Sequence, residues 1–126
     1  MAIPANKIVD LAKLDKYAID YFVSNQLVTR AKNANTRGIS FKLTHAQLKA
    51  LLKRKTCFYC KQKLVIMAGS PKPSNHFTID RINPKEGYTK ENGVACCDAC
   101  NALKSSFEYK SLKDITRLTY IVEKIL

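Results

Sequence analysis

CFYC (57–60) is the first of three segments that together indicate the fold. The other two are HFTIDRINPKEGYTKEN (76–92) and CCDACNALK (96–104). The first and the last segment each carry a Cys-x-x-Cys pair, and such a pair places two thiolates on one side of a tight turn. Two of these turns complete a tetrahedral site of soft ligands, which suits a structural zinc ion. The spacing therefore predicts one zinc ion held by Cys57, Cys60, Cys97 and Cys100.

The remaining cysteine, Cys96, does not have the same spacing. It could replace Cys97 only by breaking the two-residue gap to Cys100, so we interpret it as a buried apolar side chain. Disulfides or unrelated free cysteines are the alternatives to a metal site. Residues 1–10 show no signal-peptide pattern, so we expect reduced thiols and a metal.

The segment between the cysteine pairs predicts a second site of harder ligands. Residues 78–82 alternate like a short strand, residues 83–87 have turn chemistry, and residues 102–107 can form a short helix. A strand, a turn and a helix held by one zinc ion would bring Asp80 and Asn101 together. A carboxylate and an amide oxygen suit Mg²⁺ or another hard divalent ion.

The order of these motifs resembles the HNH endonucleases, in the zinc-stapled ββα-metal branch common in bacteriophages. The resemblance rests on four motifs in this order: Cys-x-x-Cys, Asp-Arg-Ile, Gly-Tyr-Thr-x-Glu-Asn and Cys-x-x-Cys-Asn-x-x-Lys. Short upstream motifs at residues 30–32, 37–41 and 43–44 also match. It covers roughly residues 30–108. It implies an α+β fold with a treble-clef-like ββα-metal core, stapled by a zinc site of four cysteines and flanked by N- and C-terminal helices.

The resemblance also implies an activity and residues for it. The protein would be a metal-dependent DNA endonuclease that hydrolyses phosphodiester bonds, with zinc outside the chemistry. Asp80 and Asn101 would hold a catalytic Mg²⁺ or Mn²⁺ ion. Asn92 would brace the loop that carries the base, and Lys104 would face a DNA phosphate.

One residue departs from the family pattern. The family's general base is a His directly after the Asp, and this chain has Arg81 there. An arginine is protonated at any working pH, so it cannot accept a proton from water. The alternatives are a tyrosine base (Tyr88 or Tyr109), His76, which a strand would carry about 16 Å away, or a metal-bound water with Arg81 stabilising phosphorane charge.

A second function therefore stays open. The same fold, with zinc and its basic surface kept, could serve as a catalytically impaired DNA-binding or regulatory protein that docks on nucleic acid or on a nucleic-acid enzyme. An RNA target is a weaker option, because nothing in the sequence reads a 2′-hydroxyl.

The charge distribution indicates a polyanionic partner. The formal net charge is +12 and the pI about 9.6, and no acidic residue lies between Asp20 and Asp80. A field of one sign over half the chain attracts nucleic acid, although a solvated surface is the simpler alternative. Without an aromatic ladder for single strands, we expect duplex or branched DNA. The predicted DNA contacts besides Lys104 are Arg37, Lys53, Arg54 and Lys55.

The length of 126 residues suits a single domain, with a helical basic lead-in (1–55), the zinc-stapled core (56–108) and a C-terminal helix (109–126). We expect a helix over 6–28, broken near Ser24 and Asn25, and a second helix to about Asn35. A capping box at 44–47 starts another helix to about Arg54. The inward stripe of the C-terminal helix is predicted to comprise Leu112, Ile115, Leu118, Val122 and Ile125.

No apolar run approaches the ~18 residues of a membrane span. The resemblance of the motifs to those of bacteriophage proteins implies a viral or mobile-element gene whose product acts in bacterial cytoplasm. The sequence leaves the oligomeric state open.

Overall fold

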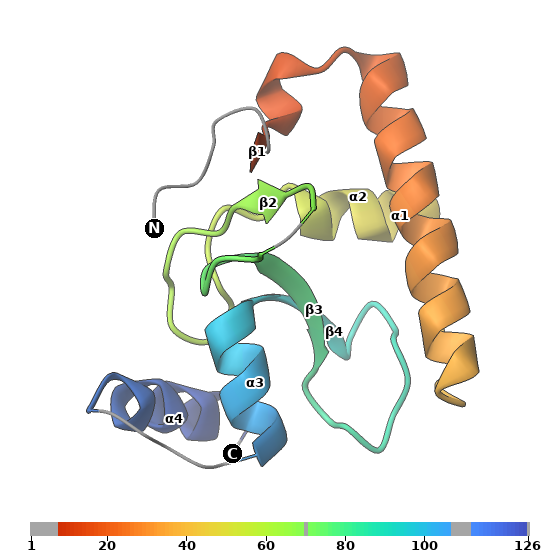
Figure 1. Ribbon diagram of the computed structural model, residues 1–126. Helices are drawn as coiled ribbons and strands as arrows, with labels where there is room; N and C mark the ends of the chain where they lie inside the picture. Colours follow the sequence, from red (N-terminus) through yellow and green to blue (C-terminus); the bar gives the residue numbers. More distant parts are fainter. Residues whose placement is uncertain (1–7, 70, 107–111, 126) are drawn as a thin grey trace. The chain divides into compact units, whose positions relative to one another are not determined.

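Two two-stranded sheets and four α-helices form the described part of the chain (Figure 1). The computed structural model describes residues 8–69, 71–106 and 112–125. This composition confirms the predicted α+β class. In chain order the elements are β1 (Ile8–Val9), a short 3-10 helix (Leu11–Lys13), α1 (Lys16–Thr36), α2 (His45–Leu52), β2 (Ile66–Met67), β3 (Phe77–Arg81), β4 (Gly93–Cys97), α3 (Asp98–Ser106) and α4 (Leu112–Ile125).

The chain divides into two compact units, each assembled from separated segments. Unit 1 takes the described residues of Met1–Val9, Arg54–Asp80 and Ala95–Leu126, and unit 2 comprises Asp10–Lys53 and Arg81–Val94. The loop after β3 thus belongs with the lead-in rather than with the cysteines. The single domain over residues 1–126 stays a prediction.

In unit 2, α1 begins later than the apolar pattern suggested. Asp15, which interrupts that pattern, is the N-cap, and its side chain accepts a hydrogen bond from the Ala18 amide at 2.8 Å. The predicted start at Asn6 lies outside the described residues. The predicted break near Ser24 and Asn25 is wrong, because α1 continues without interruption through both residues. The Ser24 hydroxyl donates a hydrogen bond to the Asp20 carbonyl of the same helix at 2.8 Å.

The connection to α2 follows the sequence closely. Gly38 has a φ of +71°, which a glycine adopts without strain, and it stands just past the end of α1. The capping box of Thr44 and Gln47 is confirmed, with both of its hydrogen bonds present. Leu48 and Leu52 are buried, and α2 packs against α1.

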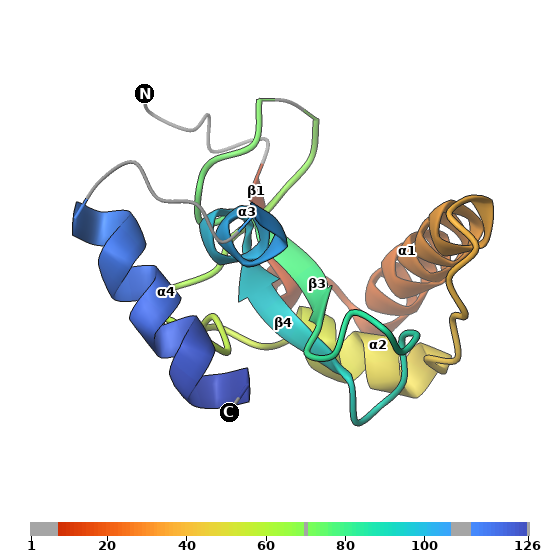
Figure 2. The ribbon, with the colours of Figure 1, turned by 90° about the horizontal axis from the view of Figure 1, so that it is seen from below.

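In unit 1, the elements that carry the candidate site follow one another directly. β3 and β4 are neighbours in one sheet, and β4 leads without a break into α3 (Figure 2). This is a β-β-α order. The second sheet pairs Ile8 with Met67, so the first described residues are tied to the segment after the first cysteine pair.

The buried line of α4 differs from the predicted stripe. Ile121 is fully buried, whereas Ile115, Val122 and Ile125 are 42%, 38% and 36% exposed. The helix packs on α3, and the buried Ile121 lies about 100° around the helix axis from the exposed Val122. Spacing of three and four residues fits a line through either residue, so the sequence alone could not select the buried one.

Candidate metal centre and active site

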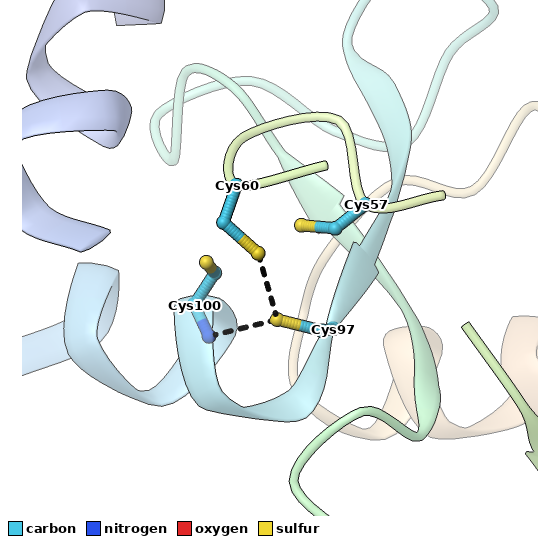
Figure 3. Close-up of side chains that lie close together, drawn as sticks. All are labelled: Cys57, Cys60, Cys97 and Cys100. Atoms are coloured by element: carbon cyan, nitrogen blue, oxygen red, sulfur yellow. Dashed lines mark hydrogen bonds between the residues drawn. The ribbon is translucent and has the colours of Figure 1, made fainter. Parts of the chain in front are cut away.

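Four thiols converge between the first cysteine turn (residues 57–62) and the junction of β4 with α3 (Figure 3). The Sγ atoms of Cys57, Cys60, Cys97 and Cys100 all lie within 4.8 Å of one another. The Cys60 and Cys97 sulfurs are 3.8 Å apart, and four Zn–S bonds of about 2.3 Å require a tetrahedral edge of about 3.8 Å. The cluster therefore fits a metal ion, as the spacing predicted.

Backbone hydrogen bonds fix the first cysteine turn on β4. The Phe58 amide donates to the Ala95 carbonyl at 2.8 Å, and the Cys57 amide donates to the Gln62 carbonyl at 2.8 Å. The Cys100 amide donates to the Cys97 sulfur at 3.4 Å. These contacts fix the backbone that carries the thiols.

Hydrogen bonding between Cys57 and Cys100 lowers the pKa of the Cys57 thiol and raises the pKa of the Cys100 thiol. The deprotonated form of a thiol is the one that binds a metal ion. Cys96 lies outside the cluster and is fully buried, and its thiol donates to the Cys97 carbonyl at 3.2 Å. All five cysteines are free thiols.

Asp80 lies in β3 at the centre of a buried polar group in unit 1. Its Oδ2 atom is 3.0 Å from the Lys104 ammonium, and these two side chains are only 9% and 7% exposed. The same oxygen accepts a hydrogen bond from the Tyr59 hydroxyl. Lys104 Nζ also lies 6.0 Å from the centroid of the Tyr59 ring. The predicted metal-binding carboxylate is thus held by an ammonium and a phenol.

Tyr59 was not among the residues predicted from the sequence. It occupies the interior of the first cysteine turn and is 1% exposed. Burial, followed by the hydrogen bond to Asp80, raises its pKa, so the phenol stays protonated and acts as a donor. The aromatic pair inside CFYC was the available signal, since a cysteine turn does not itself require aromatic residues.

Asn101 lies in α3, directly after the cluster residue Cys100, and is half-buried. A hard divalent ion at the Asp80 carboxylate would have to share it with the Lys104 ammonium or displace that ammonium. The Asp80 carboxylate thus already binds one cation, the Lys104 ammonium. A divalent ion with Asp80 and Asn101 as ligands stays a prediction.

Arg81 belongs to unit 2, where it holds the loop that follows β3. Its Nη1 atom donates to the carbonyls of Pro84 and Glu86 at 2.9 and 3.0 Å. Its guanidinium carbon lies 5.5 Å from the centroid of the Tyr88 ring. The residue that stands in place of the family's histidine therefore has a structural task in this loop.

Asn92 makes further bonds across the same loop. Its Oδ1 atom accepts from the Asn83 amide at 2.8 Å, and its Nδ2 atom donates to the carbonyls of Asn83 and Gly87 at 3.0 and 2.9 Å. It is 5% exposed. These bonds are what a loop-bracing residue requires, while a part in catalysis stays a prediction.

Residues 40–42, within the stretch that carries the upstream motifs, pair with this loop. The Tyr88 amide donates to the Ser40 carbonyl at 2.9 Å, and the Lys42 amide donates to the Tyr88 carbonyl at 2.8 Å. The rings of Phe41 and Tyr88 are 5.6 Å apart. Segments that are far apart in the sequence therefore form one hydrogen-bonded structure in unit 2.

The alternative bases and the predicted DNA contacts lie at several separate places in the structure. His76 accepts a hydrogen bond from the Met67 amide at its Nδ1 atom, at 3.3 Å, and Tyr109 lies outside the described residues. Four of the five predicted DNA contacts are exposed, Arg37 and Lys53 in unit 2 and Arg54 and Lys55 in unit 1. The fifth, Lys104, is only 8% exposed and is paired with Asp80. No described helix is long and apolar enough to cross a membrane.

Comparison with known proteins agrees with the fold. The structure is similar to the solved structure of the rare-cutting HNH restriction endonuclease PacI, with a TM-score of 0.52 and 20% sequence identity over 98% of this chain and 89% of that chain. This similarity confirms the predicted resemblance to HNH endonucleases at the level of the fold. No protein-family model matches the sequence. No curated protein matches it either.

Proposed function

We propose that this protein is a metal-dependent endonuclease of the HNH type that hydrolyses phosphodiester bonds in DNA. The observation that carries the proposal is the β-β-α segment next to a four-thiol cluster, with the buried Asp80 carboxylate on β3. The similarity in fold to an HNH restriction endonuclease supports the same class of reaction.

Two metals would have separate tasks. Zinc at the four cysteines would hold the first cysteine turn against β4 and α3. Mg²⁺ or Mn²⁺ at Asp80 and Asn101 would polarise the scissile phosphate and stabilise the leaving 3′ oxygen. Tyr59 would orient the Asp80 carboxylate through its hydrogen bond. A Lys104 ammonium displaced from Asp80 would then be available to a phosphate of the substrate.

The loop residues would contribute by position. Arg81 cannot accept a proton, and its bonds to Pro84 and Glu86 hold it in the loop. Asn92 would keep that loop rigid. The water would be activated without Arg81, and Tyr59 is a poor base because its phenol donates to Asp80.

The substrate we propose is duplex or branched DNA, bound through four exposed basic residues of the lead-in, Arg37, Lys53, Arg54 and Lys55. The net charge of +12 supports a polyanionic partner. A bacterial cytoplasmic setting and a phage gene are part of the same proposal and rest on the sequence resemblance.

A binding or regulatory protein is the second candidate. The observation that favours it is that Lys104 neutralises Asp80 and that loop carbonyls occupy Arg81. In this case the protein would bind nucleic acid without cutting it.

Plasmid cleavage by purified protein tests the proposal. The protein is dialysed free of loosely bound ions, then assayed with Mg²⁺, with Mn²⁺ and with neither. Asp80→Asn is the matched variant, because it keeps the shape of the side chain and an acceptor for Tyr59. Cutting that needs the added ion and is lost in Asp80→Asn, with zinc content unchanged, supports the nuclease. Salt-sensitive DNA binding without cutting under any ion would leave the second candidate.

A further inference from the structure

A cationic surface lies in unit 1, outside the residues assigned above. It comprises Phe58, Lys61 and Gln62 of the first cysteine turn with Arg117 and Lys124 of α4, and we call it the turn–α4 face. The segment that contains this turn and α4 lie beside each other in Figure 2. None of these residues belongs to the thiol cluster or to the group around Asp80.

Two ammonium groups share one aromatic ring on this face. Lys61 Nζ and Lys124 Nζ lie 5.8 and 5.2 Å from the centroid of the Phe58 ring. The ring attracts each cation, but the two cations repel each other. Within the described part of the chain, neither ammonium forms an ion pair with a carboxylate. An anion bound at this face would offset the charge of both ammonium groups.

Arg117 adds an incompletely bonded guanidinium. Its Nη2 atom donates to Gln62 Oε1 at 3.1 Å, while its Nε atom is buried and has no hydrogen-bond partner among the described residues. A buried donor without an acceptor is rare in folded proteins and costs free energy. Arg117 and Lys124 are seven residues apart in α4, so they lie on the same side of the helix.

The backbone at Lys61 is strained. Its φ of +65° lies in the left-handed region, and it is the only described residue other than glycine with a positive φ. A glycine would adopt this conformation without strain, whereas a lysine adopts it at a cost. Its ammonium donates to the Phe58 carbonyl at 3.3 Å. A charged side chain kept where glycine is favoured points to a use for the charge.

We propose that the turn–α4 face binds the phosphodiester backbone of a nucleic acid, as a contact additional to the site at Asp80. The class of ligand rests on the proposed function. A guanidinium and two flexible ammonium groups suit phosphate oxygens spaced along a strand. Of the acidic residues in α4, Glu123 is displaced by about 100° around the helix from Lys124, and Asp114 is already engaged in another interaction.

Salt-dependent binding tests this face. A short fluorescent DNA duplex is titrated with the full-length protein by fluorescence anisotropy over a range of NaCl concentrations, without added divalent ions. In Lys61→Gly with Lys124→Gln, we expect the slope of log affinity against log salt to fall by about one for each cation removed, and affinity near 0.15 M salt to fall by about tenfold. The matched control is Lys13→Gln, because Lys13 lies between Asp10 and Asp15 and its charge is locally balanced. Its slope should equal that of the wild type.

Two further measurements separate binding from folding. Lys61→Gly should melt at the same temperature as the wild type or higher, since it relieves the strained φ. Arg117→Gln leaves the backbone of the first cysteine turn untouched and should also reduce the slope by about one. An unchanged slope in both the double variant and Arg117→Gln would overturn this inference. Absence of salt-dependent DNA binding by the wild type would instead overturn the proposed function itself.

Discussion

Lys104 Nζ lies 3.0 Å from Asp80 Oδ2, and both side chains are more than nine-tenths buried. A charge that is deprived of its partner at such a site is strongly destabilising, because water cannot reach it. Every substitution of Asp80 therefore changes stability as well as the metal binding proposed for it. Loss of activity in an Asp80 variant has to be read beside its unfolding curve.

We predict that Asp80→Ala and Lys104→Met each lower the free energy of unfolding by about 3–5 kcal/mol. The double variant Asp80→Ala with Lys104→Met should lose less than the sum, because neither charge is then left alone. Urea unfolding of the four proteins measures this coupling. Strictly additive losses would show that the two groups do not stabilise each other.

Tyr59→Phe should lower the free energy of unfolding by about 1.5–3 kcal/mol, since it removes one hydrogen bond to a carboxylate and keeps the ring. The folded-state pKa of Tyr59 is raised above its ordinary value of 10.0. Its contribution is therefore fully present below pH 10 and is lost as the pH rises further. Unfolding measured from neutral to alkaline pH should show a smaller alkaline loss in Tyr59→Phe. Tyr17→Phe, at an 83% exposed tyrosine, should behave as the wild type.

Arg81→His introduces the histidine that the sequence resemblance to HNH endonucleases implies as a base, yet we predict no gain in DNA cleavage. The histidine cannot replace both bonds of the guanidinium to the carbonyls of Pro84 and Glu86, so the loop should lose about 1–3 kcal/mol of stability. Plasmid cleavage across a pH series, with Arg81→Lys as the control for charge, checks the outcome. A faster histidine variant would mean that loop geometry does not limit the reaction.

Gly87→Ala should destabilise unit 2 by about 1–3 kcal/mol through overpacking. A Cβ atom at residue 87 would lie 2.5 Å from the Ser40 carbonyl oxygen, and a backbone oxygen cannot turn away as a side chain can. Glu86→Ala, at an exposed neighbour, is the control and should be nearly neutral. Thermal melting of the two variants compares them, and equal melting temperatures would show that the backbone at Ser40 yields.

Two adjacent cysteines should respond differently to substitution. Cys97→Ala removes a member of the four-thiol cluster, whereas Cys96→Ala leaves the cluster intact. Metal analysis should find one zinc ion per chain in Cys96→Ala and a loss in Cys97→Ala. A structural zinc site contributes about 10–16 kcal/mol of apparent binding free energy, so chelation should unfold unit 1 in the wild type. Retained zinc in Cys97→Ala would mean that Cys96 replaces it.

Local patterns accounted for the parts of the fold that could be predicted. Each Cys-x-x-Cys spacing fixes two thiols within a few residues, and the capping box of Thr44 and Gln47 is contained in one turn. The order of the motifs was sufficient to predict the α+β core, because β3, β4 and α3 follow one another in the sequence.

The features that sequence reasoning missed depend on distant partners. β1 exists because Ile8 pairs with Met67, and periodicity within residues 6–28 could not show that pairing. Tyr59 and Lys104 meet at Asp80 only after the cysteines have brought three segments together. Asn92 was the exception, since the family resemblance supplied the expectation of a bracing role and its hydrogen bonds cross the loop accordingly.

The division into interleaved units bears on the order in which the chain can fold during its synthesis. Unit 2 needs residues up to 94, and the Asp80 ion pair of unit 1 needs Lys104. When the first 53 residues have left the ribosome, α1 and α2 exist without the segment that the lead-in binds. Unit 2 cannot close before residue 94 has been made, and the Asp80 ion pair cannot form before Lys104, so the basic lead-in is made well before the segment that completes its unit.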